Sequence, residues 1–299
     1  MSRVTVQRKV SQEISEITDA ILHDGRILAT ERLGGMTNYT YAVTLESGKY
    51  VVRLPGAGTE TLINRYHEKT STELASTLDI CEQILHFDAE SGIKVTEYIC
   101  GAVTLSAEMM RQADFIKEAS ALLHCLHTSG RDTGVPFDVF DMAIHYETFI
   151  SENNGSFYDN YATVRAKVME YKELIDSWKI PLTPCHNDPL CENWIRNSER
   201  LYLIDWEYAG MNDPLWDVAD ISIEADYDEA LDHLLLEAYF GRQPTPQELF
   251  RFQVNKVFVD FLWSLWGKTR VPFDGEPMEQ YALERYQRLE KNLALVKQA

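Results

Sequence analysis

The sequence predicts an α+β protein in two parts, a small strand-rich part over residues 1–100 and a larger, mostly helical part over residues 101–299. Strand-like runs bounded by turn residues are concentrated before residue 100, and long runs of helical periodicity follow it. A chain of 299 residues can also form two hydrophobic cores. We therefore expect a small antiparallel sheet followed by a helical lobe.

The first part is expected to contain both helices and strands. In chain order the pattern predicts a helix over residues 11–22, strands over 26–32, 39–46 and 49–54, a helix over 61–77, and strands over 79–87 and 94–99. Gly101 follows directly, and a glycine there suits a swivel between the two parts.

The second part is expected to be built mainly from helices. They are predicted over residues 107–128, 142–150 and 158–178, and four more follow the polar segment 185–207. The first of these four begins near Asp213, because an Asp before Pro214 is a strong helix start.

The polar segment 185–207 contains the candidate catalytic and metal-binding residues. Cys185-His186-Asn187-Asp188-Pro189-Leu190-Cys191-Glu192-Asn193 is followed by Leu203-Ile204-Asp205-Trp206-Glu207. Transfer of a γ-phosphoryl group needs a carboxylate to orient the attacking hydroxyl and hard oxygen ligands for Mg²⁺. Asp188 fits the first role, and Asn193 and Asp205 fit the second. The alternative is that Asn-Asp-Pro only forms a turn.

Composition limits the class of partner. The net charge of −19 argues against nucleic acid and favours a cationic substrate. No apolar run approaches a membrane span, and the N-terminal residues lack an apolar signal core, so we expect no membrane insertion. The five scattered cysteines suit a reducing, cytoplasmic environment.

The segment 185–207 resembles the catalytic loop and metal-binding strand of choline/ethanolamine kinases and aminoglycoside phosphotransferases, which are relatives of protein kinases. The resemblance implies a bilobal protein-kinase-like fold, ATP as co-substrate and Mg²⁺ as the metal. It also implies that Asp188 acts as the base and that Glu207 contacts a second metal or its waters. Asp217 matches the residue that ties the following helix to the catalytic loop in this group.

The resemblance extends to the first part of the chain. Gly34-Gly35-Met36-Thr37-Asn38, then Val51-Val52-Arg53-Leu54, is similar to choline kinases in particular. It implies nucleotide contacts from Gly35, Asn38 and Arg53 and an ion pair between Arg53 and Glu68. Glu97-Tyr98-Ile99-Cys100-Gly101 resembles the hinge, where backbone groups near Glu97 and Ile99 can contact adenine. Alternatively, Gly-Gly is an ordinary hairpin turn and Glu68 a solvated helix charge.

The substrate residues are also implied by resemblance. Trp263 and Trp266 share a helix face, and aromatic faces with a carboxylate nearby bind a quaternary ammonium by cation–π contact and charge. We expect Tyr281 on the last helix, after a loop rich in Pro and Gly. With Glu224 and Tyr227, this order resembles the choline pocket of choline kinases. Without that context, Trp-x-x-Trp indicates core packing.

The function expected from these features is a choline kinase that makes phosphocholine, similar to the compact bacterial members of the family. Ethanolamine kinase is an alternative, since it shares every catalytic residue. An aminoglycoside kinase would need a wide acidic cleft, and a pseudokinase would bind a cationic metabolite without chemistry. The sequence does not predict an oligomeric state.

Overall fold

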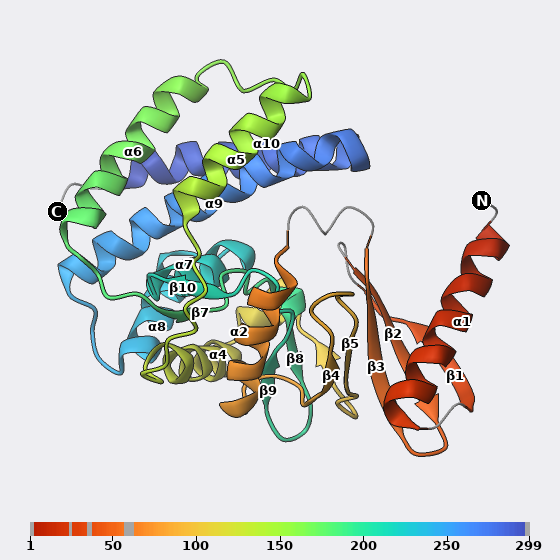
Figure 1. Cartoon of the computed structure of the whole chain (residues 1–299). Coiled ribbons are helices and arrows are strands. Elements are labelled where there is room, and N and C mark those ends of the chain that lie inside the picture. Colours follow the sequence, from red (N-terminus) through yellow and green to blue (C-terminus); the bar gives the residue numbers. More distant parts are fainter. Residues whose placement is uncertain (1–2, 24–25, 35–37, 57–62, 297–299) are drawn as a thin grey trace. The chain divides into compact units, whose positions relative to one another are not determined.

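The computed structural model describes residues 3–23, 26–34, 38–56 and 63–296, with side chains from residue 12 onward (Figure 1). The chain divides into two compact units. The first unit comprises Met1–Val103 and Ile195–Glu207, and the second comprises Thr104–Trp194 and Tyr208–Ala299. Nothing in the local sequence pattern indicated that residues 195–207 would group with the first unit.

The first unit contains a five-stranded antiparallel sheet with the order β1-β2-β3-β5-β4. Its strands are β1 (Ile27–Arg32), β2 (Asn38–Leu45), β3 (Lys49–Pro55), β4 (Ile84–Phe87) and β5 (Lys94–Glu97). The expected strand over residues 79–87 begins only at Ile84. The preceding residues instead cap a helix, because Ile80 N–H bonds back to the Ala75 carbonyl at 3.0 Å and Asp79 adopts a left-handed φ of 58°.

Two helices belong to this unit. Helix α1 (Arg3–Leu22) begins earlier than the expected residue 11 and lies beside the sheet in Figure 1. Its Ile14 and Ile17 are buried in one cluster with apolar residues of the sheet. Helix α2 (Arg65–Thr77) begins after Asn64, whose side chain accepts hydrogen bonds from the backbone N–H groups of Tyr66 and His67. That cap places Glu68 in the first turn of α2, with its side chain buried.

The hairpin of β8 (Trp194–Arg196) and β9 (Leu201–Leu203) carries residues 195–207 back to the first unit. Leu203 N–H donates to the Ile80 carbonyl at 3.1 Å. The Arg200 guanidinium bonds both the carbonyl and the carboxylate of Asp79. The hairpin is thus fixed to the turn between α2 and β4.

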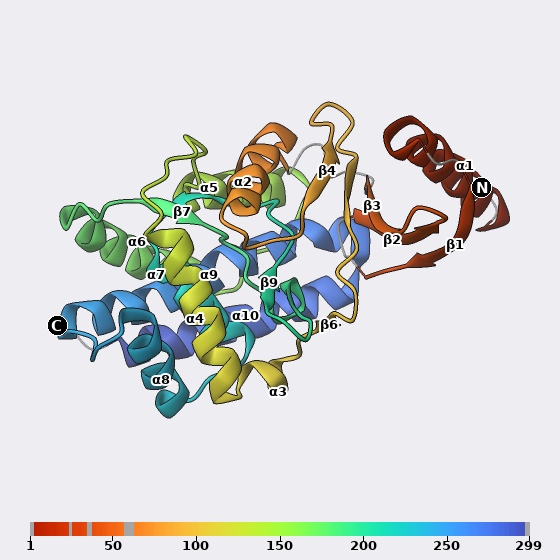
Figure 2. The same cartoon turned by 90° about the horizontal axis from the view of Figure 1, so that it is seen from below.

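The second unit is mostly helical (Figure 2). Its helices are α3 (Ala107–Met110), α4 (Ala113–His127), α5 (Val139–Glu152), α6 (Tyr161–Ser177), α7 (Leu215–Glu224), α8 (Glu229–Phe240), α9 (Pro246–Asp274) and α10 (Glu276–Leu295). Short strands β7 (Thr183–Cys185) and β10 (Gly210–Asn212) pair in antiparallel register, and β6 is limited to Val103–Thr104. None of the helices in the described part of the chain is long and apolar enough to cross a membrane.

Two expectations for this unit are wrong in detail. The single helix expected over residues 107–128 breaks after Met110, because the Tyr227 hydroxyl occupies the Met110 carbonyl and the Arg111 side chain bonds the Ala225 carbonyl. The loop expected before Tyr281 is absent, since α9 continues through Pro272 to Asp274 and only Gly275 separates it from α10.

Helix α9 is the centre of the second core. Its residues are buried almost continuously from Val254 to Gly267, and it contacts α5, α6, α7 and α10. Gly267 permits the close approach of α10, because a Cβ there would lie 2.7 Å from the Tyr281 ring and 3.0 Å from the Ala282 Cβ. This contact sets Tyr281 beside the tryptophans of α9.

Candidate active site

The loop predicted to be catalytic, which carries Asp188, follows β7 and ends in the 3-10 turn Cys191–Asn193; it is called the catalytic loop below. Asn187 adopts a left-handed φ of 67°, which asparagine tolerates better than most residues. Its side-chain amide donates to the Tyr208 carbonyl at 3.0 Å, and its side-chain oxygen accepts from Asn212 at 2.9 Å. These bonds hold the loop in a strained conformation that the turn motif alone would not maintain.

Asp217 ties α7 to this loop, which confirms the prediction for that residue. Its two carboxylate oxygens accept the backbone N–H groups of His186 and Asn187 at 2.8 and 2.7 Å. His127 Nε2 lies 3.0 Å from the same carboxylate, and His127 Nδ1 lies 2.8 Å from the Tyr239 hydroxyl. The carboxylate is fully buried, so these partners offset the cost of its charge.

The neighbouring Cys185 thiol gives His127, Cys185 and Asp217 the composition of a possible metal site. Burial raises the pKa of the Cys185 thiol well above its ordinary value, and Asp217 raises it further. A neutral thiol is a poor ligand, and Asp217 is already bonded to the loop. We therefore interpret the group as the internal support of the catalytic loop.

Asn193 is fixed against the residue expected to orient the substrate. Its Nδ2 donates to the Asp188 backbone carbonyl at 2.8 Å, so its carboxamide oxygen is the atom that can serve as a ligand. Burial raises the pKa of Tyr146 above its ordinary value, and the Asp188 carboxylate raises it further. Tyr146 of α5 therefore lies near Asp188, although no motif in its own segment predicted this.

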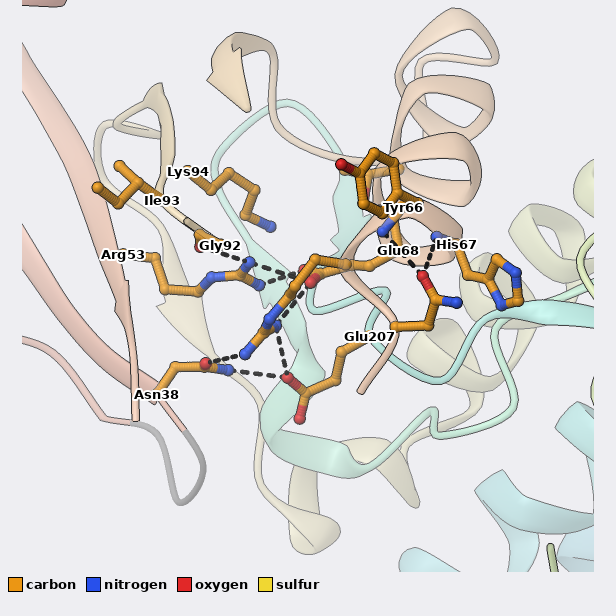
Figure 3. Close-up of polar contacts among 12 residues, drawn as sticks. Asn38, Arg53, Tyr66, His67, Glu68, Gly92, Ile93, Lys94 and Glu207 are labelled. Carbon is orange, nitrogen blue, oxygen red and sulfur yellow. Dashed lines mark hydrogen bonds and ion pairs between the residues drawn. The ribbon is translucent and has the colours of Figure 1, made fainter. Parts of the chain in front are cut away.

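In the first unit, Arg53 of β3 and Glu68 of α2 form the predicted ion pair (Figure 3). Arg53 Nη2 donates to Glu68 Oε2 at 3.0 Å and Nη1 donates to Oε1. Burial alone would lower the pKa of Arg53, but Glu68 raises it above its ordinary value; burial alone would raise the pKa of Glu68, but Arg53 lowers it. Both groups are therefore held in their charged forms.

Arg65, which the sequence reasoning missed, extends this pair into a buried cluster. Its guanidinium donates to Glu68 at 2.6 Å and to Asn38 Oδ1 at 2.8 Å, and it lies 3.5 Å from Glu207 Oε2. Asn38 Nδ2 donates to the same Glu207 oxygen at 2.8 Å. The i, i+3 spacing of Arg65 and Glu68 on α2 was a signal that could have found it. We refer to Asn38, Arg53, Arg65, Glu68 and Glu207 as the Arg53 cluster.

Asp205 lies just beyond β9 rather than within a strand, with a left-handed φ of 67°. Its charge is among those that raise the pKa of Arg53, after the dominant effects of burial and Glu68. The first unit therefore brings Asp205, Glu207 and Arg53 into one region. The metal roles of Asp205 and Glu207 stay predictions.

The remaining nucleotide residues are placed by the first unit only in part. Gly35 lies outside the described residues. Glu97 ends β5 and is exposed, with its N–H donating to the Gln83 carbonyl. The Ile99 carbonyl accepts from Ala102 N–H at 3.3 Å, and Gly101 has a φ of 69°, so the segment turns sharply here. The adenine contacts stay predictions.

Glu224 of α7 is paired with an arginine of the second unit. Its Oε1 accepts from Arg285 Nη2 of α10 at 2.6 Å. Asp260 of α9 accepts two bonds from Arg288 at 2.7 and 2.8 Å, and it lies 3.6 Å from Arg285 Nη1. Arg285 and Arg288 were missed, because nothing in their own helix marks them as partners of residues far away in the sequence.

The three predicted aromatic rings lie in sequence along α9 and α10. Trp263 and Trp266 have centroids 6.3 Å apart with perpendicular planes, and Trp266 lies 5.8 Å from Tyr281. The Trp266 Nε1 donates to the Tyr208 hydroxyl at 3.1 Å, and Trp263 packs edge-on against the same Tyr208. The Tyr227 hydroxyl donates to the Met110 carbonyl, and the substrate contact of Tyr227 stays a prediction.

Tyr281 packs beside Trp266, and the charge of Asp188 in the catalytic loop also acts on it. Burial raises the pKa of its hydroxyl; Arg285 opposes the rise, whereas Glu224, Asp188 and Asp220 add to it. The Arg285 guanidinium carbon lies 4.6 Å from the centre of the Tyr281 ring. The second unit therefore brings together Asp188, Glu224 and Tyr281, together with Asp220, which the sequence reasoning did not single out.

Comparison with known proteins gives consistent results. The family model "Choline/ethanolamine kinase" matches residues 30–270. Protein LicA of Haemophilus influenzae is 32% identical over 85% of this chain and 76% of its own length. The crystal structure of choline kinase LicA from Streptococcus pneumoniae is 34% identical, with a TM-score of 0.82 over 95% of this chain and 98% of that one. This likeness confirms the expected bilobal protein-kinase-like fold.

A protein of the other named activity also matches. Human ethanolamine kinase 2 is 29% identical to this chain over 78% of it and 67% of its own length.

Proposed function

Because the chain belongs to the choline/ethanolamine kinase family, we propose that it is an ATP-dependent choline kinase, which transfers the γ-phosphoryl group of ATP to the choline hydroxyl and forms phosphocholine. One observation carries the choice of substrate. Tyr281 packs beside Trp266 and lies within electrostatic reach of Asp188, so aromatic faces and the expected catalytic carboxylate share one part of the second unit. With ATP as co-substrate, we propose that the protein acts in the cytoplasm.

Phosphoryl transfer requires positioning and charge stabilisation more than covalent help from the protein. We assign to Asp188 the role of accepting a hydrogen bond from the choline hydroxyl and orienting it. The fixed backbone around Asp188 suits this role, because Asp217 and Asn187 hold the loop from both sides. Arg53 is assigned to the nucleotide phosphates, and Glu68 keeps its guanidinium charged and in place.

A kinase that uses ATP needs a divalent cation, and we propose that it is Mg²⁺. Asn193 offers its carboxamide oxygen, since its nitrogen is bound to Asp188, and Asp205 offers a carboxylate. Hard oxygen donors of this kind are the ligands that Mg²⁺ takes together with substrate phosphates. When bound, the ion would neutralise charge on the phosphates. Glu207 is assigned to a second metal or its waters.

Ethanolamine kinase is the second candidate, supported by the match to human ethanolamine kinase 2. A primary ammonium is best recognised by several hydrogen-bond acceptors, whereas a quaternary ammonium cannot donate and relies on aromatic faces and charge. The region around Tyr281 is aromatic, and Glu224 is already bonded to Arg285. Both features favour choline.

The test is ADP release by the purified protein with Mg²⁺-ATP and one acceptor at a time. We expect kcat/KM to be highest for choline, lower for ethanolamine and lowest for an aminoglycoside such as kanamycin. Activity should disappear on chelation and return when Mg²⁺ is added back. A higher kcat/KM for ethanolamine than for choline would overturn the substrate assignment and leave the kinase assignment intact.

A further inference from the structure

One face of α7 carries three acidic residues. Asp217, Asp220 and Glu224 are spaced i, i+3 and i+7, so they line the same side of the helix. At one end Asp217 bonds the catalytic loop, and at the other Glu224 bonds Arg285. Asp220 lies between them, and its side chain is fully buried.

Asp220 differs from its two neighbours in having no polar partner. Neither of its carboxylate oxygens accepts a hydrogen bond from any residue that the structure describes. A buried carboxylate without a partner is costly, and such groups are rare in folded proteins. The charged Asp220 carboxylate therefore has to be stabilised by a bound ligand, or it has to take up a proton.

The charges around Asp220 show why it remains unpaired. Glu224 is bonded to Arg285, and Asp260 is bonded to Arg288 through both oxygens. The negative charges of Glu224 and Asp260 are thus matched by the positive charges of Arg285 and Arg288. Arg285 attracts Asp220 electrostatically but makes its hydrogen bond to Glu224. The carboxylate that the sequence suggested for cation binding, Glu224, is thus already neutralised.

Asp220 also lies where the acceptor substrate is expected. Burial raises the pKa of Asp220 well above its ordinary value, and Glu224 and Asp188 raise it further, so it lies near the proposed catalytic carboxylate. The pKa of Tyr281 responds to Asp220 in turn. These mutual electrostatic effects place Asp220 in the same part of the second unit as Asp188 and Tyr281.

We propose that Asp220 is the specificity residue for a positively charged acceptor: its buried carboxylate is the counter-ion of the onium group, while Glu224 and Arg285 form a fixed pair beside it. This inference rests on the proposed function and names the residue that gives it charge selectivity. A buried carboxylate attracts any onium group by charge, so Asp220 would select a cationic acceptor over an uncharged one, while the aromatic rings favour the quaternary ammonium. Binding of the cation would remove the cost of the buried charge.

The experiment compares choline with its uncharged carbon analogue, 3,3-dimethylbutan-1-ol, in wild type and Asp220→Asn. The readouts are KM for choline and for ATP, Ki of the analogue as a competitor of choline, and melting temperature. For Asp220→Asn we expect the choline KM to rise roughly tenfold or more, the size of a lost charged contact. The Ki of the analogue and the KM for ATP should stay within about twofold, since neither depends on this charge.

Asp232→Asn is the matched control. Asp232 is also an acid of the second unit, partly buried, but it is bonded to Lys256 and Ser222. We expect its removal to lower the melting temperature and leave the ratio of choline KM to analogue Ki unchanged. Asp220→Asn should instead keep or raise the melting temperature, because it removes a buried charge that has no partner. Asp220→Ser provides a second neutral variant if the asparagine form does not fold.

Two results would overturn the assignment. One is an unchanged choline KM in both neutral variants, and the other is an equal loss for choline and the analogue, which would indicate a change of shape rather than of charge. Failure of the proposed function is seen separately, in the wild type. If the wild type prefers ethanolamine, the same comparison with ethanolamine and its uncharged analogue propan-1-ol tests Asp220 directly.

Discussion

The Arg53 cluster of the first unit and the acidic face of α7 in the second unit both bury charged side chains. The two regions differ in whether each buried acid has hydrogen-bond partners. In the Arg53 cluster, Glu68 is bonded to two guanidinium groups and Glu207 to Asn38 and Arg65. On α7, Asp220 is buried to the same degree as Glu68 and has no polar partner in the described part of the chain. The charge of Glu68 is therefore neutralised within the protein, whereas no described side chain is hydrogen-bonded to Asp220.

The same contrast holds within α7 over a single helical turn. Asp217 and Asp220 are of one residue type and both are fully buried. Asp217 accepts two backbone N–H groups and a bond from His127, so its charge is used to hold the catalytic loop. Residue type and burial therefore do not distinguish Asp217 from Asp220, whereas their hydrogen-bond partners do.

The largest expected effect follows from changing the carboxylate assigned to the reaction. Asp188→Asn should lower kcat by roughly 10²–10⁴ because the substrate hydroxyl loses its orienting carboxylate. Since the loop is held by Asp217 and Asn187, the melting temperature and nucleotide affinity should stay close to those of wild type. Steady-state kinetics and thermal unfolding measure both. Near-wild-type turnover would remove Asp188 from the reaction.

The next effect concerns stability in the Arg53 cluster. Glu68→Gln leaves Arg53 and Arg65 buried without their shared counter-ion, so we expect the free energy of unfolding to fall by about 3–5 kcal/mol. Denaturant unfolding at pH 7 measures it. The matched control is Glu73→Gln on the same helix, which breaks only an exposed pair with Lys69 and should cost less than about 0.5 kcal/mol.

The pH dependence gives a second readout for the same variant. The pKa of Glu68 is lowered in the folded protein, because Arg53 outweighs the opposite effect of burial. Its contribution to stability is therefore fully present above the ordinary pKa of 4.5 and is lost as the pH falls through the lower, folded-state pKa. The stability difference between wild type and Glu68→Gln should shrink on acidification, and a constant difference would contradict the ion-pair role.

The smallest expected effect concerns Trp266 and its place in the substrate pocket. Trp266 packs against Tyr281, so Trp266→Ala should raise the choline KM about five- to thirtyfold, the equivalent of roughly 1–2 kcal/mol of cation–π contact. Trp266→Phe should cost less. The KM for ATP and the melting temperature identify a packing effect, because loss of core packing would impair both substrates together. An unchanged choline KM in a folded Trp266→Ala would exclude this ring from the pocket.

The sequence by itself determined the features that depend on short spacing. The loop containing Asp188 and Asn193, the strand carrying Arg53 and the helix carrying Glu68 were all recognisable, because turn residues, apolar alternation and helical period are local patterns. The pairing of Arg53 with Glu68 and the role of Asp217 were implied by family resemblance and are confirmed by the contacts.

The tertiary structure alone decided which charges are compensated. Asn38 and Glu207 are 169 residues apart and Glu224 and Arg285 are 61 apart, so no local pattern could reveal that either pair meets. The sequence therefore pointed to Glu224 as the carboxylate for the cation. Only the fold showed that Arg285 already neutralises Glu224, while no residue in the described ranges is hydrogen-bonded to Asp220. The physical reason is that the cost of a buried charge depends on what surrounds it in space.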